Sequence, residues 1–326
     1  MNTSAENYPG NPFSTPAGEQ EAGNAVGLHL SRRRSRELSV PTRNVRTMRG
    51  VRGSHAEWLK VLTELDPRGA ISYVSAAKWW GIPLPPWCEV SDTVHVSVPT
   101  GTMSMRRAQV TGHRVKTLPD EVWSVRGLRI TSPARTWLDL ARSFDVPNLT
   151  AAADFLICQY RRGQVERAQI ASPAQLRAVV SAHGGMRGIQ RARAALELMR
   201  NGVDSRPETL VRIALWEAGL PMPETNVRVE VSMGLGQTRN RWIDLGYRAF
   251  RIGIQYEGAL HMARSQFTSD IERDAQLSAR GWLTIRVTAD HVRDGSQEIV
   301  SQVIAAMRSR GWRGHLEPRD ARAAHL

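Results

Sequence analysis

The sequence predicts an α/β protein in which a smaller α+β part precedes a mixed sheet flanked by helices. Short stretches of alternating apolar and polar residues, typical of strands, stand between longer stretches with apolar residues every three or four positions, typical of helices. The chain has 326 residues, and single hydrophobic cores tend to split above about 250 residues. We therefore expect two domains.

The charge balance favours a polyanionic partner. Lys and Arg number 44 against 31 Asp and Glu, which gives a net charge of +13 and a pI near 10.9. Nucleic acid is favoured over a membrane surface because no basic amphipathic anchor is evident. No apolar run approaches the ~18 residues that a membrane helix needs. Cys88 and Cys158 form neither a disulfide framework nor a metal pattern, so we expect a cytoplasmic protein.

Composition divides the chain into six segments. They are a disordered leader over 1–30, a basic arm over 31–53, an α+β domain over 54–145, a helical linker region over 146–202, a mixed-sheet domain over 203–312 and a tail over 313–326 that we expect to fray. The arm has eight arginines and one acid, Glu37. It is either a solvated segment or one that contacts phosphates. In the second case the candidate contacts are Arg32, Arg33, Arg34, Arg43 and Arg46.

The first half is expected to begin with a helix over 54–65 that Ser54 caps. A short helix follows and ends at Gly81. Pro133 is expected in the first turn of a later helix, where its missing N–H does no harm. The strands predicted from alternation are 93–98, 109–115 and 128–131, and the later helices are 132–142, 148–161, 173–183 and 187–200.

The second half has the order helix, three strands, helix, strand, helix, which predicts a mixed sheet covered by helices. The helices are expected at 205–219, 264–280 and 297–308, and the strands at 226–231, 241–247, 250–257 and 282–287. The second and third strands form a predicted hairpin.

This hairpin carries the most informative polar residues. Ile243, Leu245 and Tyr247 are expected on one face, which leaves Trp242 and Asp244 on the other. If Arg248 and Ala249 form a two-residue turn, Asp244 lies opposite Gly253, with Gln255 diagonal to it and Glu257 further along the same face. Gly253 would leave space beside Asp244 for a metal ion or a phosphate.

Two interpretations of this polar face remain open. Oxygen ligands on neighbouring strands suit Mg²⁺ or Mn²⁺, and such an ion can activate water and neutralise a phosphoryl oxygen. Alternatively, the face is the ordinary solvent-facing side of an antiparallel hairpin. Trp242 shares the face of Asp244 and is the candidate aromatic contact to a base or sugar.

A family resemblance favours the first interpretation. The stretch 203–289 resembles the PD-(D/E)XK nuclease core and, more closely, an actinobacterial endonuclease-like domain of unknown function related to very-short-patch-repair (Vsr) endonucleases. The residues that carry the resemblance are 205–208, 242–245, 255–258, His261, 270–274, 281–282 and 286–288.

The resemblance implies a Mg²⁺- or Mn²⁺-dependent DNA endonuclease. Asp244 would be the principal metal ligand, with Gln255 and Glu208 binding directly or through water. His261 would transfer a proton or contact phosphate, and Arg264 would steady the phosphate.

Two positions depart from the family pattern. Gln255 stands where such domains often carry Glu, and a neutral amide lowers metal affinity. Glu257, grouped with the catalytic candidates, occupies the place of the nuclease lysine. Glu208 also stands three residues after Ser205, which is the spacing of a helix capping box and needs no function.

The first half resembles AbiEi-type antitoxin and transcriptional-regulator domains. The matching residues are 75–77, 80–83, 94–99 and 132–136. This resemblance implies DNA binding and a toxin partner. Three functions therefore compete: a DNA-cleaving enzyme, which the sequence favours, a DNA-binding regulator that has lost its metal, which Gln255 favours, and a protein-binding module whose sheet face recognises an acidic partner.

Overall fold

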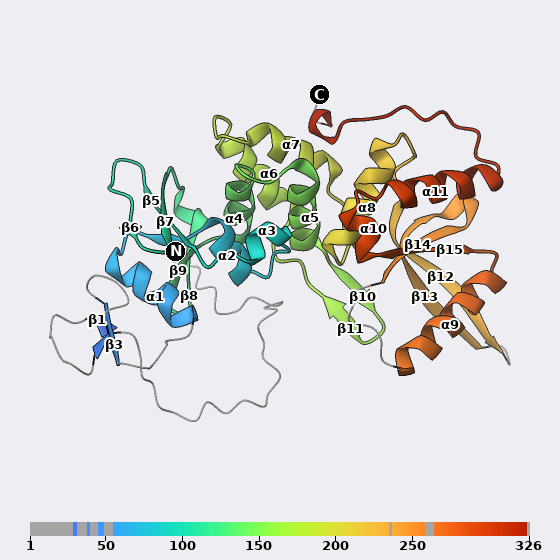
Figure 1. The fold of residues 1–326 in the computed structure, drawn as a ribbon, viewed down its shortest axis with the longest axis horizontal. Helices are drawn as coiled ribbons and strands as arrows, with labels where there is room; N and C mark the ends of the chain where they lie inside the picture. The colour runs from blue at the N-terminus through green and yellow to red at the C-terminus, as the bar shows by residue number, and fades with distance from the viewer. Residues whose placement is uncertain are drawn as a thin grey trace. The chain divides into compact units, whose positions relative to one another are not determined.

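The computed structural model describes residues 29–30, 38–39, 45–48, 55–234, 237–257 and 264–324, and the side chains of 55–233, 237–257 and 272–324. The chain divides into two compact units (Figure 1). Unit 1 comprises Met1–Arg142 and Pro173–Ala182, and unit 2 comprises Ser143–Ser172 and His183–Leu326. In the part of the chain that the structure describes, no helix has both the length and the apolar character to cross a membrane.

Unit 1 is built on a six-stranded sheet with the order β6-β7-β5-β4-β9-β8. Its strands are β4 (Ala70–Ile71), β5 (Val94–Pro99), β6 (Arg106–Arg107), β7 (Val110–Val115), β8 (Val122–Val125) and β9 (Leu128–Thr131). The three predicted strands are therefore confirmed. The sequence did not indicate β4, β6 and β8, because strands of two to four residues are too short to show alternation.

The helices of unit 1 are α1 (His55–Leu65), α2 (Tyr73–Trp79), α3 (Pro86–Glu89), α4 (Pro133–Leu140) and α6 (Pro173–Ala182), with one 3-10 turn, η2 (Pro119–Glu121). Leu59 and Leu62 of α1 pack in one cluster with Val94, Val96 and Ile130 of the sheet. This cluster is the hydrophobic core of unit 1.

The basic arm contains backbone pairing that the sequence did not predict. The strands β1 (His29–Leu30), β2 (Leu38–Ser39) and β3 (Val45–Met48) form an antiparallel sheet in the order β1-β3-β2. Arg46 lies on β3, but its side chain is outside the described residues. The predicted contacts Arg32, Arg33, Arg34 and Arg43 also lie outside them, so their role stays a prediction.

Unit 2 is built on a four-stranded mixed sheet, as predicted. Its strands follow the order β12-β13-β14-β15, with two antiparallel pairs and then one parallel pair. They are β12 (Glu224–Gly234), β13 (Gln237–Tyr247), β14 (Ile252–Glu257) and β15 (Leu283–Thr288). The helix α9 (Arg264–Ala279) lies between the two parallel strands in the sequence, because parallel strands need a crossover connection.

The remaining elements of unit 2 are mostly helices: α5 (Val146–Ile157), α7 (Ile189–Leu198), α8 (Arg206–Glu217), α10 (Ala289–Arg293), α11 (Gln297–Ser309) and η4 (Ala321–Ala323), with a hairpin of β10 (Tyr160–Arg162) and β11 (Val165–Arg167). The predicted helix over 148–161 ends early because this hairpin follows it. The segment 146–202, predicted as one linker region, is shared between the units, since α6 belongs to unit 1.

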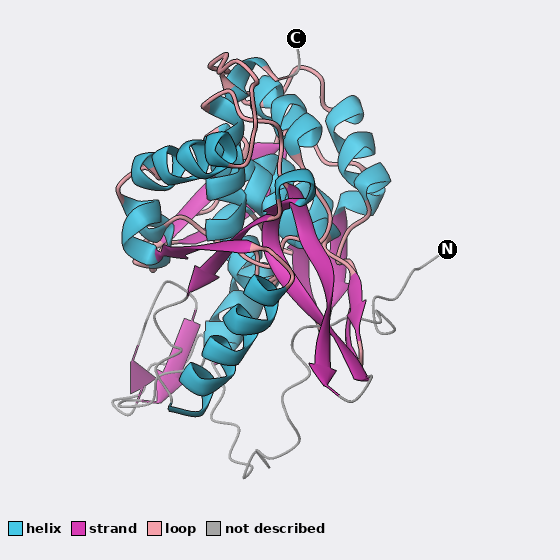
Figure 2. Ribbon diagram, turned by 90° about the vertical axis from the view of Figure 1, so that its right-hand side faces the viewer, coloured by secondary structure: helices cyan, strands magenta, loops and turns pink. Residues whose placement is uncertain are grey.

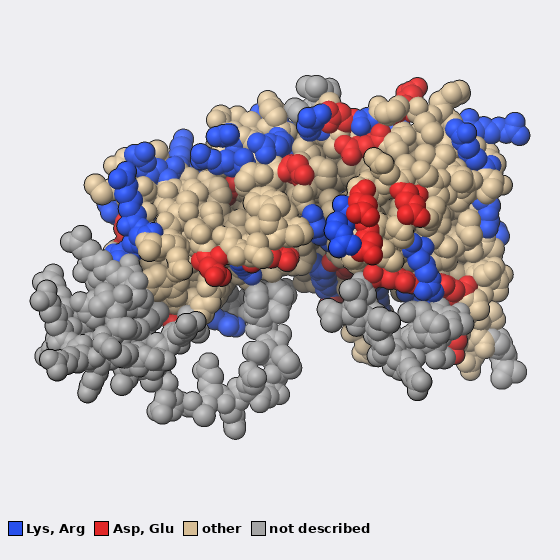
Figure 3. Space-filling model, in the orientation of Figure 1, with Lys and Arg blue, Asp and Glu red and all other residues tan. Residues whose placement is uncertain are grey.

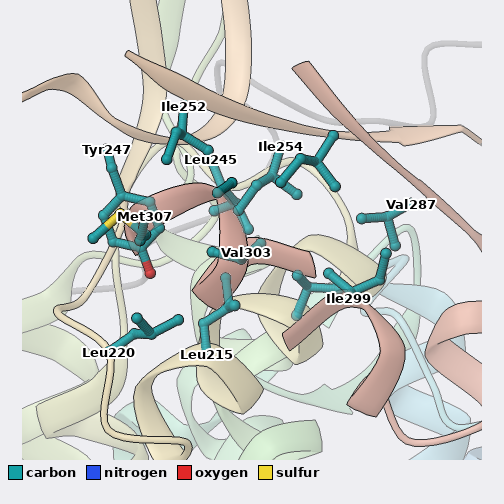
Figure 4. Close-up of a cluster of buried hydrophobic side chains, with 13 residues drawn as sticks. Leu215, Leu220, Leu245, Tyr247, Ile252, Ile254, Val287, Ile299, Val303 and Met307 are labelled. Atoms are coloured by element: carbon teal, nitrogen blue, oxygen red, sulfur yellow. The ribbon is translucent and has the colours of Figure 1, made fainter. Parts of the chain in front are cut away.

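The sheet of unit 2 has a hydrophobic cluster with α8 and α11. Leu245, Ile252 and Ile254 of the sheet pack with Leu215 of α8 and Val303 of α11 (Figure 4). A second cluster joins strand residues to Leu277 of α9. Figure 2 shows the strands with helices packed beside them. The sheet is therefore covered on both faces.

The connection between β13 and β14 is longer than predicted. It consists of a 3-10 turn, η3 (Arg248–Phe250), and Arg251, which adopts a left-handed φ of 49°. Tyr247 therefore pairs with Ile252 and not with Phe250. The predicted register is wrong by two residues. Because side chains alternate with a period of two, a shift of two residues does not by itself exchange the two faces of a strand.

The corrected register changes the neighbours of Asp244. Leu245 pairs with Ile254, so the next position places Gln255, and not Gly253, opposite Asp244. The space predicted beside Gly253 is also filled, because a Cβ atom there would lie 2.9 Å from Cγ2 of Ile243. Gly253 therefore permits close packing and does not open a ligand site.

Strand alternation in β13 breaks at Asp244. Ile243 belongs to the cluster with Leu277 and Trp282, whereas Leu245 and Tyr247 belong to the cluster with α8 and α11. The prediction that these three apolar residues share a face is therefore wrong. Helices cover both faces of this sheet, so the polar residues of the hairpin are not the solvent-facing side of a half-exposed sheet.

The tail is ordered as far as residue 324, which corrects the prediction that it frays. Ala321 is 1% exposed and packs in a cluster with residues of α5, α7 and α8. The guanidinium of Arg319 donates to the carbonyl oxygens of Trp216 and Leu220. Gly219 allows the tail to approach, because a Cβ there would lie 2.5 Å from the backbone nitrogen of Glu317.

Candidate functional site

Glu208 lies in the first turn of α8 with its side chain buried. It is 8% exposed. Ser205 Oγ donates a hydrogen bond to Oε1 of Glu208 over 2.7 Å, and the backbone N–H of Asp204 donates to Oε2 over 3.2 Å. The Ser205 side chain therefore binds the carboxylate and does not cap the backbone of the helix.

Asp244 lies on β13, where the pairing with β14 stops. The backbone N–H of Tyr256 donates to Oδ2 of Asp244 over 2.9 Å. Burial raises the pKa of Asp244, while the Tyr256 N–H and the charges of Arg273 and Arg162 act in the opposite direction. The Asp244 carboxylate thus accepts a hydrogen bond from a backbone N–H that could otherwise bind a carbonyl oxygen of the neighbouring strand.

Glu208 and Asp244 are electrically coupled. Burial is the main cause that raises the pKa of Glu208 to about 8, and the charge of Asp244 is the next largest. Two buried carboxylates whose charges interact cannot both ionise easily. At neutral pH one carboxyl group of the pair therefore keeps a proton, unless a bound cation reduces the repulsion between the two carboxylates.

Gln255 lies beside this pair, but Glu257 does not join it. Gln255 is 8% exposed, and its Nε2 donates to the carbonyl oxygen of Trp242 over 3.2 Å. Glu257 forms an ion pair with Arg286, which also binds Asp274. The structure thus brings Glu208, Asp244 and Gln255 together and places Glu257 in a separate exposed cluster.

An arginine of the β10–β11 hairpin lies close to the same site. Arg162 forms an ion pair with Asp204 over 3.0 Å and donates to Oδ1 of Asn226 over 2.6 Å. Its guanidinium also lies 4.1 Å from the ring centroid of Tyr160 and 5.5 Å from that of Trp242. The sequence does not predict this contact, because the expected helix over 148–161 covers only the start of β10 and the strands are too short to show alternation.

The described side chains offer an incomplete metal site. Over 55–233, 237–257 and 272–324, no group of three or more His, Cys, Asp or Glu side chains could hold a metal ion. His261 lies outside the described residues, and only the backbone of Arg264 is described. The two carboxylates and the amide oxygen are of a type that Mg²⁺ accepts, but their roles as ligands stay a prediction.

Unit 1 has its own buried ionic cluster. Arg135 of α4 is 1% exposed, and its guanidinium binds Asp139 over 2.9 Å and Glu121 over 2.6 Å. It also donates to the carbonyl oxygen of Lys116 over 2.7 Å. Ser132 accepts a hydrogen bond from the backbone N–H of Arg135 and so caps the helix. The motif 132–136 thus begins α4 and anchors it to its surroundings.

A histidine pair lies in the sheet of the same unit. Nδ1 of His95 on β5 and Nε2 of His113 on β7 lie 2.9 Å apart, and the rings are 10° from coplanar. Tyr73 stacks on His113 at 3.9 Å and adopts a φ of 49°. This hydrogen bond needs one donor and one acceptor, so it cannot form when both rings are protonated.

Unit 2 also contains a compensated ion pair that the sequence did not predict. Arg212 of α8 binds Asp154 of α5 over 2.6 Å, and both side chains are at most 1% exposed. Thr209 Oγ1 and the backbone N–H of Arg200 also donate to Asp154. The available signal was a lone Asp inside the apolar helix over 146–157.

Comparisons with known proteins match the resemblance of the first half to AbiEi-type antitoxin domains. A family model described as the AbiEi antitoxin C-terminal domain matches residues 70–198, which include every residue that carried that resemblance. An uncharacterized protein of Mycobacterium tuberculosis, in strain CDC 1551 / Oshkosh and again in strain H37Rv, is 27% identical over 173 residues. The aligned part covers 52% of this chain and 58% of the length of these relatives.

No solved structure matches the chain. The resemblance of 203–289 to Vsr endonucleases has no support from these comparisons. The specific PD-(D/E)XK fold thus stays a prediction, although the sheet of unit 2 is mixed and lies between helices.

Proposed function

We propose that this protein is an antitoxin-like, DNA-binding regulator with a toxin partner. The observation that carries the proposal is the match of the AbiEi antitoxin C-terminal domain to residues 70–198. The same segment holds the buried cluster around Arg135 and the predicted 132–136 motif. Antitoxin function and the toxin partner rest on this match.

The charge distribution supports DNA as a partner. The segment 31–53 has eight arginines and one glutamate, which is more than half of the net charge of +13. On the face drawn in Figure 3, basic side chains are mixed with acidic ones over both units. We therefore assign the main phosphate contacts to the basic arm, because clustered arginines displace counterions from DNA.

The polar site in unit 2 supports a regulator over a nuclease. Gln255 is neutral and offers a metal ion only its Oε1, because its Nε2 donates to the carbonyl oxygen of Trp242. Glu257 is paired with Arg286. Neither position therefore adds a charged ligand beside Asp244.

The test is binding to the DNA upstream of the protein's own gene, followed by footprinting over a range of salt concentrations. We expect a bounded footprint and an affinity that falls steeply with salt, by about 10³-fold or more between 50 and 200 mM if six or more phosphates are contacted. An affinity that barely changes with salt would contradict the role given to the arm.

A metal-dependent nuclease is the second candidate, and the Glu208–Asp244 pair is the observation that favours it. Mg²⁺ or Mn²⁺ held by Asp244, Glu208 and Gln255 would supply an activated water and neutralise phosphoryl charge. A metal-binding readout tests this candidate without activity. Mn²⁺ should raise the melting temperature of wild type but not of Asp244→Asn, and equal responses would remove the candidate.

A further inference from the structure

The outer part of the β12–β13 hairpin is a two-stranded ribbon. The pairing of β12 with β13 continues from Glu224↔Gly246 out to Gly234↔Gln237, whereas β14 pairs with β13 only at residues 245–247. Residues 228–234 and 237–242 therefore lie beyond the residues of β13 with which β14 pairs.

The two faces of this ribbon differ in chemistry. Val227, Val229 and Val231 pack with Leu277 of α9, so one face is buried. The opposite face carries only hydrogen-bonding groups and one tryptophan. Its exposed residues are Arg228, Glu230, Ser232, Thr238 and Asn240, and Trp242 is partly exposed at its inner end.

The polar face is partly organised. Arg228 lies diagonal to Asn240, since their direct partners are Trp242 and Glu230. Nε of Arg228 donates to Oδ1 of Asn240 over 2.8 Å. This bond fixes one edge of the guanidinium and leaves the amide NH₂ of Asn240 directed away from it. Arg and Asn are the side chains that most often read guanine and adenine in the major groove.

Three guanidinium groups flank the ribbon. Arg239 and Arg241 lie on the valine face of β13, at the strand edge that β14 leaves unpaired, and Arg273 lies on α9. Nε of Arg241 donates to Oε1 of Gln276, and Arg239 is exposed. Burial lowers the pKa of Arg241, and the positive charges of Arg239 and Arg273 lower it further. A phosphate placed near these arginines would reduce their mutual repulsion.

We propose that the polar face of residues 228–232 and 238–242 enters the major groove of double-stranded DNA and reads base edges, while Arg239 contacts the backbone from the free edge of β13. The major groove is about 12 Å wide and admits a two-stranded ribbon. Arg228 and Asn240 are the reading residues, and Thr238 and Ser232 supply further hydroxyl contacts. This inference rests on the proposed DNA binding. It adds which part of the protein recognises the base sequence.

The test uses the full chain and two duplexes of the same length. One duplex is selected by wild type from a random pool, and the other is a scrambled version of it. Arg228→Ala and Asn240→Ala should each weaken binding to the selected duplex by about 10-fold or more. Binding to the scrambled duplex should change by less than about 2-fold, because phosphate contacts carry no sequence information.

Arg308→Ala is the matched control, since Arg308 is an exposed arginine of α11 in the same unit. It should leave the preference for the selected duplex over the scrambled duplex unchanged. Melting temperatures equal to that of wild type would show that all variants fold. If Arg228→Ala and Asn240→Ala keep the wild-type preference, the ribbon is not the reader although the protein binds DNA. If wild type binds no duplex at low salt, the proposed function fails together with this inference.

Discussion

Each unit encloses a pair of largely buried carboxylates, and the two pairs differ in what neutralises them. In unit 1, the guanidinium of Arg135 binds both Asp139 and Glu121. In unit 2, the hydrogen bonds to Glu208 and Asp244 come from Ser205 and from backbone N–H groups. Burial raises the pKa of Asp139 to about 6 although Arg135 acts in the opposite direction, whereas the pKa of Glu208, which binds no arginine among the described residues, is raised to about 8.

The difference separates a structural cluster from a candidate site. A buried ion pair with good geometry holds its elements in place, although it adds little net stability over apolar packing. A carboxylate pair without a bound cation costs stability near neutral pH and persists where a ligand or a proton is useful. Residue type alone does not distinguish the two clusters, because both consist of ordinary Asp and Glu.

The largest effect should follow from removing the cation of unit 1. Arg135→Ala leaves two buried carboxylates without their cation, so we expect a loss of about 3–5 kcal/mol in the free energy of unfolding. Denaturant unfolding at pH 7 measures it. Arg68→Ala removes an exposed arginine that pairs with Asp66 and should change little. Equal losses in the two variants would contradict the importance of burial.

The next effect concerns pH and Glu208. The folded protein keeps the Glu208 proton up to about pH 8, whereas the ordinary pKa is 4.5. Unfolding therefore releases a proton between these values, and stability falls as pH rises through this window. Glu208→Gln mimics the protonated form, so it should match wild type near pH 4.5 and exceed it at pH 8, by on the order of 2 kcal/mol.

The control for this titration is Glu257→Gln, since Glu257 lies in an exposed ion pair with Arg286. It should not reproduce the gain at pH 8. If Glu208→Gln and wild type have parallel stability curves from pH 4.5 to 8, the two carboxylates are not coupled as the structure indicates.

How much of this contrast was predictable depends on the distance in sequence between the contacting groups. Most helices and the longer strands followed from periodicity, and Asp244 and Gln255 were expected close together although the predicted register was wrong by two residues. The partners of Arg135 and Arg212 were not predictable, because Glu121 and Asp154 are 14 and 58 residues away. Contacts between distant elements leave no periodic signal.

The predicted metal site was harder to judge for a different reason. Alternation indicated which residues share a face, but it could not show that Ile243 fills the space beside Gly253 or that Arg286 engages Glu257. Packing and ion pairing decide whether oxygen ligands are available. A row of polar residues on two strands therefore predicts a location more reliably than a chemistry.

A smaller pH effect of the opposite sign should come from the histidine pair of unit 1. Burial lowers the pKa of His113 to about 4, and the charges of His95 and Arg142 lower it further. Burial and the charge of Lys78 also lower the pKa of His95. Between pH 6.5 and 4 the unfolded chain takes up protons that the folded chain does not, so stability falls as pH falls.

His113→Gln removes one of these titrations and should reduce the loss of stability between pH 6.5 and 4. Melting temperatures across this range measure it. Glu208→Gln should not reduce this acid-side loss, because the Glu208 effect has the opposite sign where its window from 4.5 to about 8 overlaps that of the histidines. An acid-side loss identical in His113→Gln and wild type would show that the pair does not govern it.

The most direct test of the regulator proposal is one reaction in which binding and cleavage are both observed. Supercoiled plasmid carrying the upstream DNA is incubated with wild type in Mg²⁺ or Mn²⁺, with Asp244→Ala and EDTA as controls, and resolved both as complexes and after removal of protein. We expect a retarded complex whose DNA is intact. Nicked or linear DNA with wild type, absent with Asp244→Ala and with EDTA, would contradict the proposal and establish the nuclease.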